Sequence, residues 1–277
     1  MVQLGVDAKG WRRFYCPVCG HVEWVAPGEQ LPAHYTCPLC GVGRKTMLAL
    51  DDPRLARHEV VFEEIAPGLF RADKRPPFRE DFQHYSYILR HPRGLILYDA
   101  PPVVTAEAVD AIRAMGEPRL LVVSHQDFVG FAGDWAEALG IPAWMGEGDS
   151  PLPGNRFAPS EWVSEPVLLE DGLEVVPVPG HSAGSLAVYW EDSPSGPALL
   201  SGDAITVWQH DDGRTQLAFF QNPPAGEAIR ELASRPVSVL ASCGGHLKNA
   251  AEPLGRLLEM PGNCARPWRG ETGGVWL

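Results

Sequence analysis

The 277-residue sequence has few lysines and no long apolar segment. Only four of its 23 basic residues are lysines, and the formal net charge is −12. A face that binds nucleic acid needs clustered positive charge, so we expect no nucleic-acid partner. No stretch reaches the roughly 18 apolar residues of a membrane-spanning helix, and residues 1–16 lack the apolar core of a signal peptide. We therefore expect a cytoplasmic protein without a membrane partner.

Cysteine is scarce too, yet four of the six cysteines form two close pairs. In a reducing compartment such pairs bind metal more often than they form disulfides. Each CxxC turn places two sulfurs on one side of an ion, so two turns match a tetrahedral four-thiolate site for zinc or iron. The pairs are Cys16 with Cys19 and Cys37 with Cys40. The short segment around them needs the metal for much of its folding energy.

The sequence around these cysteines resembles that of rubredoxin. The resemblance covers residues 11–46 and depends on "CPLCGVG" and on Tyr15 and Tyr35, which stand just before the two pairs. It implies one iron on four cysteines and transfer of single electrons. A zinc ribbon of the same shape, without redox activity, is the alternative, and both metals stay open.

After a proline-containing linker, short apolar runs alternate with turns and helical patterns. We expect a cysteine-containing domain over residues 1–50 and a larger domain over residues 58–277. Helices covering two mostly β layers is the simplest packing for this order of elements. Predicted strands span 59–65, 85–90, 94–100, 119–125, 141–145, 167–172, 173–180, 185–190, 198–205 and 237–242. Predicted helices span 105–116, 130–140, 225–234 and 250–260.

Polar residues that bind metals follow several of the predicted strands. Each follows an apolar run and lies in or beside a turn that contains glycine, as expected for ligands that project from one edge of a rigid core. These residues are His125, Asp127, His181, Asp203 and His246. Any one of them alone is an ordinary surface or capping residue, but together they predict a metal site.

This set of residues resembles the metallo-β-lactamase superfamily. The resemblance covers residues 58–260, and its most specific part is "VPVPGHSAGSLAVYW" followed by "ALLSGDAI". It implies an α/β (α+β) fold, the four-layer αββα sandwich, with a metal site along one edge of the two sheets. The small rubredoxin-like or zinc-ribbon domain precedes that sandwich.

The superfamily's first loop reads Thr/Ser-His-x-His-x-Asp-His, and this chain keeps only part of it. His125 stands at the first histidine and Asp127 at the second, whereas Val129 replaces the aspartate and Gly130 the last histidine. Valine has no lone pair and glycine no side chain. The resemblance therefore implies that the second metal loses two ligands.

One metal keeps a full set of ligands in this alignment. The resemblance assigns it His125, Asp127, His181 and Asp203, and leaves the second metal only Asp203 and His246. We expect one well-held divalent metal, zinc, iron or manganese, or a second that is weak and depends on substrate. Three roles remain for His246: a metal ligand, a hydrogen-bond donor to substrate, or a residue left over from the second metal site without a present function.

Five further residues have weaker predictions. Asp99 matches the superfamily's early strand-end aspartate, a supporting residue and not a ligand. His84 and His210 are secondary candidates for the same edge, and a structural role is the more common one for a lone histidine. Cys243 and Cys264 lack a partner motif, so we expect them to be buried or incidental.

Three functions are compatible with these residues. The first is hydrolysis of a small molecule through a metal-activated water, with Asp127 or Asp203 as proton acceptor. The second is a mononuclear non-heme iron oxidoreductase coupled to the rubredoxin-like domain and to a redox partner, since two histidines and a carboxylate bind ferrous iron. The third is a metal-stabilised scaffold without catalysis.

Overall fold

The computed structural model describes residues 10–55, 59–75, 84–150, 157–170, 172–220, 226–260 and 271–277. Residues 10–50, named the cysteine module below, form a small sheet with the strand order β2-β1-β3. Its strands are β1 (Arg12–Tyr15), β2 (Val22–Val25) and β3 (Leu48–Ala49), and a short 3-10 helix, η1, spans Arg44–Thr46. The predicted domain boundaries at residues 50 and 58 stay a prediction.

Two larger sheets form the rest of the molecule. The seven-stranded sheet has the order β10-β9-β8-β7-β6-β5-β4, and the six-stranded sheet β11-β12-β13-β14-β17-β18. The first contains β4 (Glu59–Ala66), β5 (Leu69–Arg75), β6 (Ser86–His91), β7 (Gly94–Tyr98), β8 (Pro118–Val122), β9 (Ala143–Gly146) and β10 (Glu161–Val163). The second contains β11 (Val167–Glu170), β12 (Leu173–Pro177), β13 (Leu186–Trp190), β14 (Ala198–Leu200), β17 (Val239–Ser242) and β18 (Gly245–Lys248). A third sheet joins β15 (Ile205–Gln209), β16 (Thr215–Phe219) and β19 (Val275–Trp276).

The helices begin and end where the sequence provides capping residues. They are α1 (Ala106–Met115), α2 (Ala132–Leu139), α3 (Glu227–Ser234) and α4 (Ala251–Glu259). The Thr105 hydroxyl accepts a hydrogen bond of 3.1 Å from the Ala108 N–H, which satisfies a free donor of the first turn of α1. Gly140 ends α2 with φ of 73°, a conformation that favours glycine.

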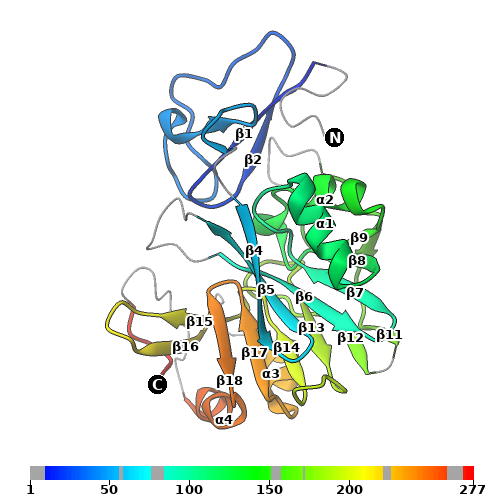
Figure 1. The fold of residues 1–277 in the computed structure, drawn as a ribbon. Helices are drawn as coiled ribbons and strands as arrows, with labels where there is room; N and C mark the ends of the chain where they lie inside the picture. The colour runs from blue at the N-terminus through cyan, green and yellow to red at the C-terminus, as the bar shows by residue number, and fades with distance from the viewer. Residues whose placement is uncertain are drawn as a thin grey trace.

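The alternation of side chains along β7 explains the four layers. Successive residues of a strand point to opposite faces of the sheet. Leu95 and Leu97 therefore pack in the same cluster as Ile112 of α1, while Ile96 and Tyr98 belong to the core between the two sheets. A third cluster contains residues of α3 and α4 and covers the outer face of the six-stranded sheet. The predicted αββα sandwich is confirmed (Figure 1).

One predicted strand is divided in two. Residues 198–205 were predicted to form one strand, but β14 ends at Leu200 and β15 begins at Ile205. Gly202 has φ of 55° in the intervening turn, and a β-carbon there would lie 2.8 Å from the Ser124 Cβ. The turn thus places Asp203 beside the end of β8. Among the described residues, no helix is long and apolar enough to cross a membrane.

The cysteine module packs directly on the larger part of the chain. Figure 1 shows it next to α2, and Arg13 of β1 forms a buried ion pair with Asp134 of that helix. The ring of Tyr15 lies 5.3 Å from the ring of Phe131, centroid to centroid. Tyr15 and Val22 belong to the same apolar cluster as Trp135 of α2. The module and the sandwich therefore share part of one core.

Candidate metal centres

The predicted ligands of the main site come from the ends of three strands. His125 follows β8 and precedes the 3-10 helix η3 (Gln126–Phe128), which contains Asp127. His181 lies in the turn after β12, and Asp203 in the turn after β14. These strands belong to both sheets, so the residues meet at one edge of the sandwich.

Each of the two carboxylates approaches both imidazoles closely enough to share an ion with them. Oδ2 of Asp203 lies 3.5 Å from His125 Nε2 and 3.7 Å from His181 Nε2. Oδ2 of Asp127 lies 3.8 Å and 3.9 Å from the same two atoms. Ligands about 2.1 Å from a tetrahedral ion are separated by roughly 3.4 Å, so these carboxylate–imidazole distances are close to those around a bound ion.

Hydrogen bonds on the far side of each imidazole leave the Nε2 atoms available. The Nδ1 of His181 lies 3.1 Å from the Phe220 carbonyl oxygen and donates to it, while Nδ1 of His125 lies 2.9 Å from the Ser124 hydroxyl. Nε2 of His125 is buried without a hydrogen-bond partner. An orphaned buried nitrogen aimed at two carboxylates is the arrangement expected of a metal ligand, so the residues fit a divalent ion.

Charge pairing dominates the protonation of the main site. Burial alone would lower the pKa of His125, but the negatively charged carboxylates of Asp203 and Asp127 outweigh it and raise the pKa to about 9. Burial would raise the pKa of Asp203, and the imidazole of His125 instead lowers it. The metal-free site therefore holds a proton on an imidazole beside an ionised carboxylate, and a metal ion must displace that proton.

Asp99 has the supporting position that its alignment implies. It follows β7 with φ of 62° and accepts a hydrogen bond of 2.7 Å from the Ser124 N–H. Its side chain is buried, and burial raises its pKa to about 7. The bond orients the residue that precedes His125.

Asp149 is a positioning residue that the sequence analysis missed. Its Oδ2 accepts hydrogen bonds from the Gln126 N–H (2.9 Å) and the Ser182 hydroxyl (2.7 Å), and its Oδ1 accepts one from the Gly184 N–H (2.7 Å). It therefore connects the Asp127 loop to the His181 loop. Gly146 is packed so closely that a β-carbon would lie 1.9 Å from the Gly184 carbonyl oxygen. The sequence feature that could have predicted this role is the pair of glycines in residues 146–148, at the end of a strand and directly before Asp149.

The positions of the second metal's missing ligands are filled by packing. Val129 is 1% exposed and belongs to the core beneath α1 and α2. A β-carbon on Gly130 would lie 3.0 Å from the carbonyl oxygen of Gly20, in the cysteine module. Any side chain at Gly130 would meet that backbone atom.

His246 lies in β18, beside charged residues of the neighbouring sheet. Burial lowers its pKa, and the positive charges of Arg71 and Lys248 lower it further. In the described part of the chain, the main-site donor group whose ligand atoms all lie within 4.8 Å of one another comprises His125, Asp127 and His181; Asp203 and His246 both lie outside it. A ligand role for His246 stays a prediction.

The other single residues have structural partners. Nε2 of His210 lies 2.9 Å from the Gln216 amide oxygen, and the ring of His210 stacks on Trp276. Cys243 is buried, and its carbonyl accepts a hydrogen bond from the Tyr85 N–H. Cys264 lies outside the described residues.

The four cysteines of the module converge as predicted. Their sulfurs lie within 4.8 Å of one another, with 3.5 Å between those of Cys16 and Cys40 and between those of Cys19 and Cys37. Gly20 and Gly41 follow the pairs with φ of 83° and 74°. Tetrahedral thiolates around zinc or iron are roughly 3.8 Å apart, so the cluster fits either ion.

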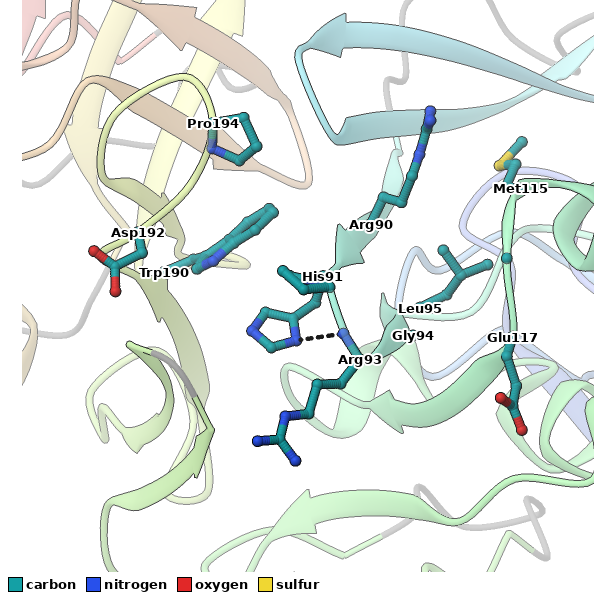
Figure 2. Close-up of a pocket in the computed structure, with 12 residues that line it drawn as sticks. Arg90, His91, Arg93, Gly94, Leu95, Met115, Glu117, Trp190, Asp192 and Pro194 are labelled. Atoms are coloured by element: carbon teal, nitrogen blue, oxygen red, sulfur yellow. Dashed lines mark hydrogen bonds between the residues drawn. The ribbon is translucent and has the colours of Figure 1, made fainter.

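A separate hollow of about 510 Å³ lies at the opposite end of β7 from Asp99. Figure 2 shows that His91 and Arg93 line it, with Trp190 on the facing strand. Nδ1 of His91 accepts a hydrogen bond of 3.3 Å from the Arg93 N–H. None of the metal-binding groups found among the described residues lies there, so this hollow is distinct from the main site.

Solved structures with this arrangement of sheets and helices include several metallo-β-lactamases. The FIM-1 enzyme of Pseudomonas aeruginosa, in its mono-zinc form, is 14% identical with a TM-score of 0.52, over 73% of this chain and 97% of its own. The DIM-1 metallo-β-lactamase is 16% identical with a TM-score of 0.50, over 73% and 97%. VMB-1 is 14% identical with a TM-score of 0.52, over 72% and 94%.

The chain has the metallo-β-lactamase fold. Among curated proteins, the uncharacterized protein YmaE of Bacillus subtilis (strain 168) is 24% identical over 208 residues, which is 70% of this chain and 72% of that protein. No family model matches the sequence. At these identities the likeness concerns the fold, so function must be argued from the residues of the site.

Proposed function

We propose that the protein is a metal-dependent hydrolase with a mononuclear main site that acts on a small-molecule substrate. The observation that carries the proposal is the approach of two carboxylates to the Nε2 atoms of His125 and His181, at 3.5–3.9 Å. Two imidazoles and two carboxylates form a donor set suited to zinc, iron or manganese. When bound, such an ion supplies Lewis acidity and lowers the pKa of water.

The side chains of the chain itself would divide the remaining work. The side chains of His125 and Asp203 are 1% and 15% exposed, so they would hold the positive charge of the ion at the base of the site. Asp127 is 33% exposed and is placed best to accept a proton from the attacking water and pass it to solvent. Asp149 would keep the two loops in register while the substrate binds.

A second candidate function is a mononuclear iron oxidoreductase that receives electrons from an iron in the cysteine module. Its support is the contact between Gly20, which directly follows Cys19, and Gly130, three residues after Asp127. A redox partner protein would reduce the module in this case. A scaffold without catalysis is the third candidate, and an empty main site in the purified protein would favour it.

The metal content of protein expressed without added metal tests the proposal. Zinc at both sites would favour hydrolysis, whereas iron at both, with the visible absorption of an iron tetrathiolate, would favour the oxidoreductase. Asp203→Ala should empty the main site and leave the cysteine cluster loaded. Asp211→Ala, an exposed carboxylate in the β15–β16 turn, is the matched control. An unchanged metal count in Asp203→Ala would contradict the ligand assignment.

Hydrolysis itself is tested with chromogenic substrates. The metal-loaded protein should hydrolyse one class among p-nitrophenyl esters, phosphodiesters and β-lactams, and Asp203→Ala should abolish that activity. Activity that survives removal of the main-site metal would contradict the proposed chemistry.

A further inference from the structure

The hollow of Figure 2 is lined by three separate parts of the chain. They are the β6–β7 hairpin (residues 90–95), the turn after α1 (residues 115–117) and, from the end of β13 onward, Trp190, Asp192 and Pro194. Its volume of about 510 Å³ is in the range of sites for small molecules. Neither candidate metal centre contributes a residue to its lining, so a ligand here would be independent of both.

His91 places an unused hydrogen-bond donor in the wall of this hollow. Its side chain is 6% exposed, and its Nδ1 accepts the Arg93 N–H at 3.3 Å, so the proton of the neutral ring is on Nε2. Nε2 is buried and has no hydrogen-bond partner among the described residues. The ring lies 5.9 Å from that of Trp190, centroid to centroid, and Figure 2 shows its second nitrogen turned away from Arg93. Because buried donors without an acceptor are rare, this one indicates an acceptor that a ligand supplies.

The charges around the hollow disfavour an anionic ligand. Arg90 and Arg93 each pair with a glutamate outside the hollow, at 3.5 Å and 2.9 Å, so their positive charges are already balanced. Glu117 and Asp192 also line it, both are exposed, and the described part of the chain provides neither with an ion-pair partner. Two unbalanced carboxylates repel an anion and accept hydrogen bonds from N–H groups.

We propose that the hollow binds a small uncharged molecule with a primary amide group on an apolar ring. The amide oxygen accepts the Nε2–H of His91, and the amide N–H group donates to Asp192, which lies on the same side of the hollow as Trp190 (Figure 2). The apolar ring packs against Trp190 and Leu95. Nε2 is covered by its neighbours, so the imidazole turns slightly as the ligand enters. This binding site goes beyond the proposed function and does not rest on it.

The test compares benzamide, benzoate and benzylamine as probes on the full-length, metal-loaded protein. Benzamide has both the acceptor and the N–H donors, benzoate has the acceptor with a negative charge, and benzylamine has donors without an acceptor. Shifts of the backbone amide signals of Arg93 and Gly94 in NMR titrations report binding at the hairpin and separate it from binding at the main site. The dissociation constant of each probe follows from the same titration.

Two variants separate the donor from the charge. His91→Phe keeps a ring beside Trp190 but removes the donor, and Asp192→Asn removes a negative charge at an exposed position. His34→Phe, at an exposed histidine of the cysteine module, is the matched control.

We expect benzamide to bind most tightly of the three probes. His91→Phe should weaken it about tenfold, the loss typical of a buried hydrogen bond, and His34→Phe should leave it unchanged. Asp192→Asn should strengthen the binding of benzoate, because the repulsion of its carboxylate is reduced.

Three results would overturn the inference. The first is that none of the probes shifts the Arg93 and Gly94 signals. The second is an unchanged benzamide affinity in His91→Phe, and the third is benzoate binding as tight as that of benzamide in the original protein. Asp203→Ala should leave benzamide binding unchanged, so a failure of the proposed metal site and a failure of this binding site are separate results.

Discussion

Each imidazole of the main site is oriented by a hydrogen bond on the side away from the two carboxylates. His181 donates to the Phe220 carbonyl, and His125 pairs with the Ser124 hydroxyl. The backbone N–H of Ser124 in turn donates a hydrogen bond to Asp99. Such outer contacts select which ring nitrogen is free for a metal. At the scale of single residues, the affinity of the site therefore depends on side chains that never touch the ion.

Asp149→Asn should weaken main-site zinc binding about 10–100-fold. The asparagine amide group would face one of the N–H or O–H donors that the carboxylate now accepts from, and the loops of Asp127 and His181 would separate. Competition with a chromogenic chelator measures the affinity, with Asp211→Asn as control. Equal affinities in the two variants would contradict a positioning role.

Asp99→Asn should change how stability depends on pH. Burial raises the pKa of Asp99 to about 7, so the unfolded chain releases this proton near pH 4 and the folded chain keeps it until near pH 7. The unfolded state therefore binds fewer protons between these values, and stability falls as the pH rises.

The Asp99→Asn variant has no carboxyl group to titrate here, so its stability should not fall in this way as the pH rises. In the metal-free protein, its free energy of unfolding should gain a few kcal/mol relative to the original chain between pH 4 and pH 7. Urea denaturation at both pH values measures the difference, and parallel pH profiles would show that Asp99 does not titrate in this range.

At the scale of elements, two glycine-containing turns bring parts of the chain together. The Gly202 turn separates β14 from β15 and places Asp203 beside β8, and Gly130 lets the loop before α2 approach the cysteine module. The strands and helices themselves follow hydrophobic periodicity, which is why most of them agree with the sequence-based prediction. The division of residues 198–205 was not predicted, because its cause is a contact with Ser124 that is distant in sequence.

Gly130→Ala should destabilise the protein by about 1–2 kcal/mol and loosen the cysteine module. The new β-carbon would be 3.0 Å from the Gly20 carbonyl oxygen, and φ of 22° is unfavourable for alanine. Gly133→Ala in α2 is the control, since its β-carbon would make an ordinary contact of 3.5 Å with Phe157. Thermal unfolding and hydrogen exchange at residues 16–20 measure both effects, which should be absent in the control.

At the scale of the whole molecule, the cysteine module and the sandwich depend on each other. Tyr15 and Val22 of the module lie in one apolar cluster with Trp135 of α2, and Arg13 pairs with Asp134. A module this small relies on its metal to fold. Loss of that metal should therefore expose part of the sandwich core and break the contact between Gly20 and Gly130.

The double change Cys37→Ser and Cys40→Ser tests this dependence. It should remove the module's metal, lower the unfolding temperature of the remaining sandwich and weaken main-site metal binding. Calorimetry and elemental analysis give the three quantities, and Cys243→Ala, at a buried thiol outside the cluster, is the control. If the sandwich unfolds at its original temperature with its metal retained, the module is an independent unit.

The sequence by itself determined the two kinds of metal-binding residue and the order of the layers. CxxC pairs and strand-end histidines act through local spacing, and alternating apolar residues set which face of each strand is buried. Only the tertiary structure decided that Asp149 joins two loops, that the Gly20 carbonyl approaches Gly130, and that His84 packs edge-on against Phe128. These relations depend on atoms that meet across long sequence separations, and no local pattern encodes such a meeting.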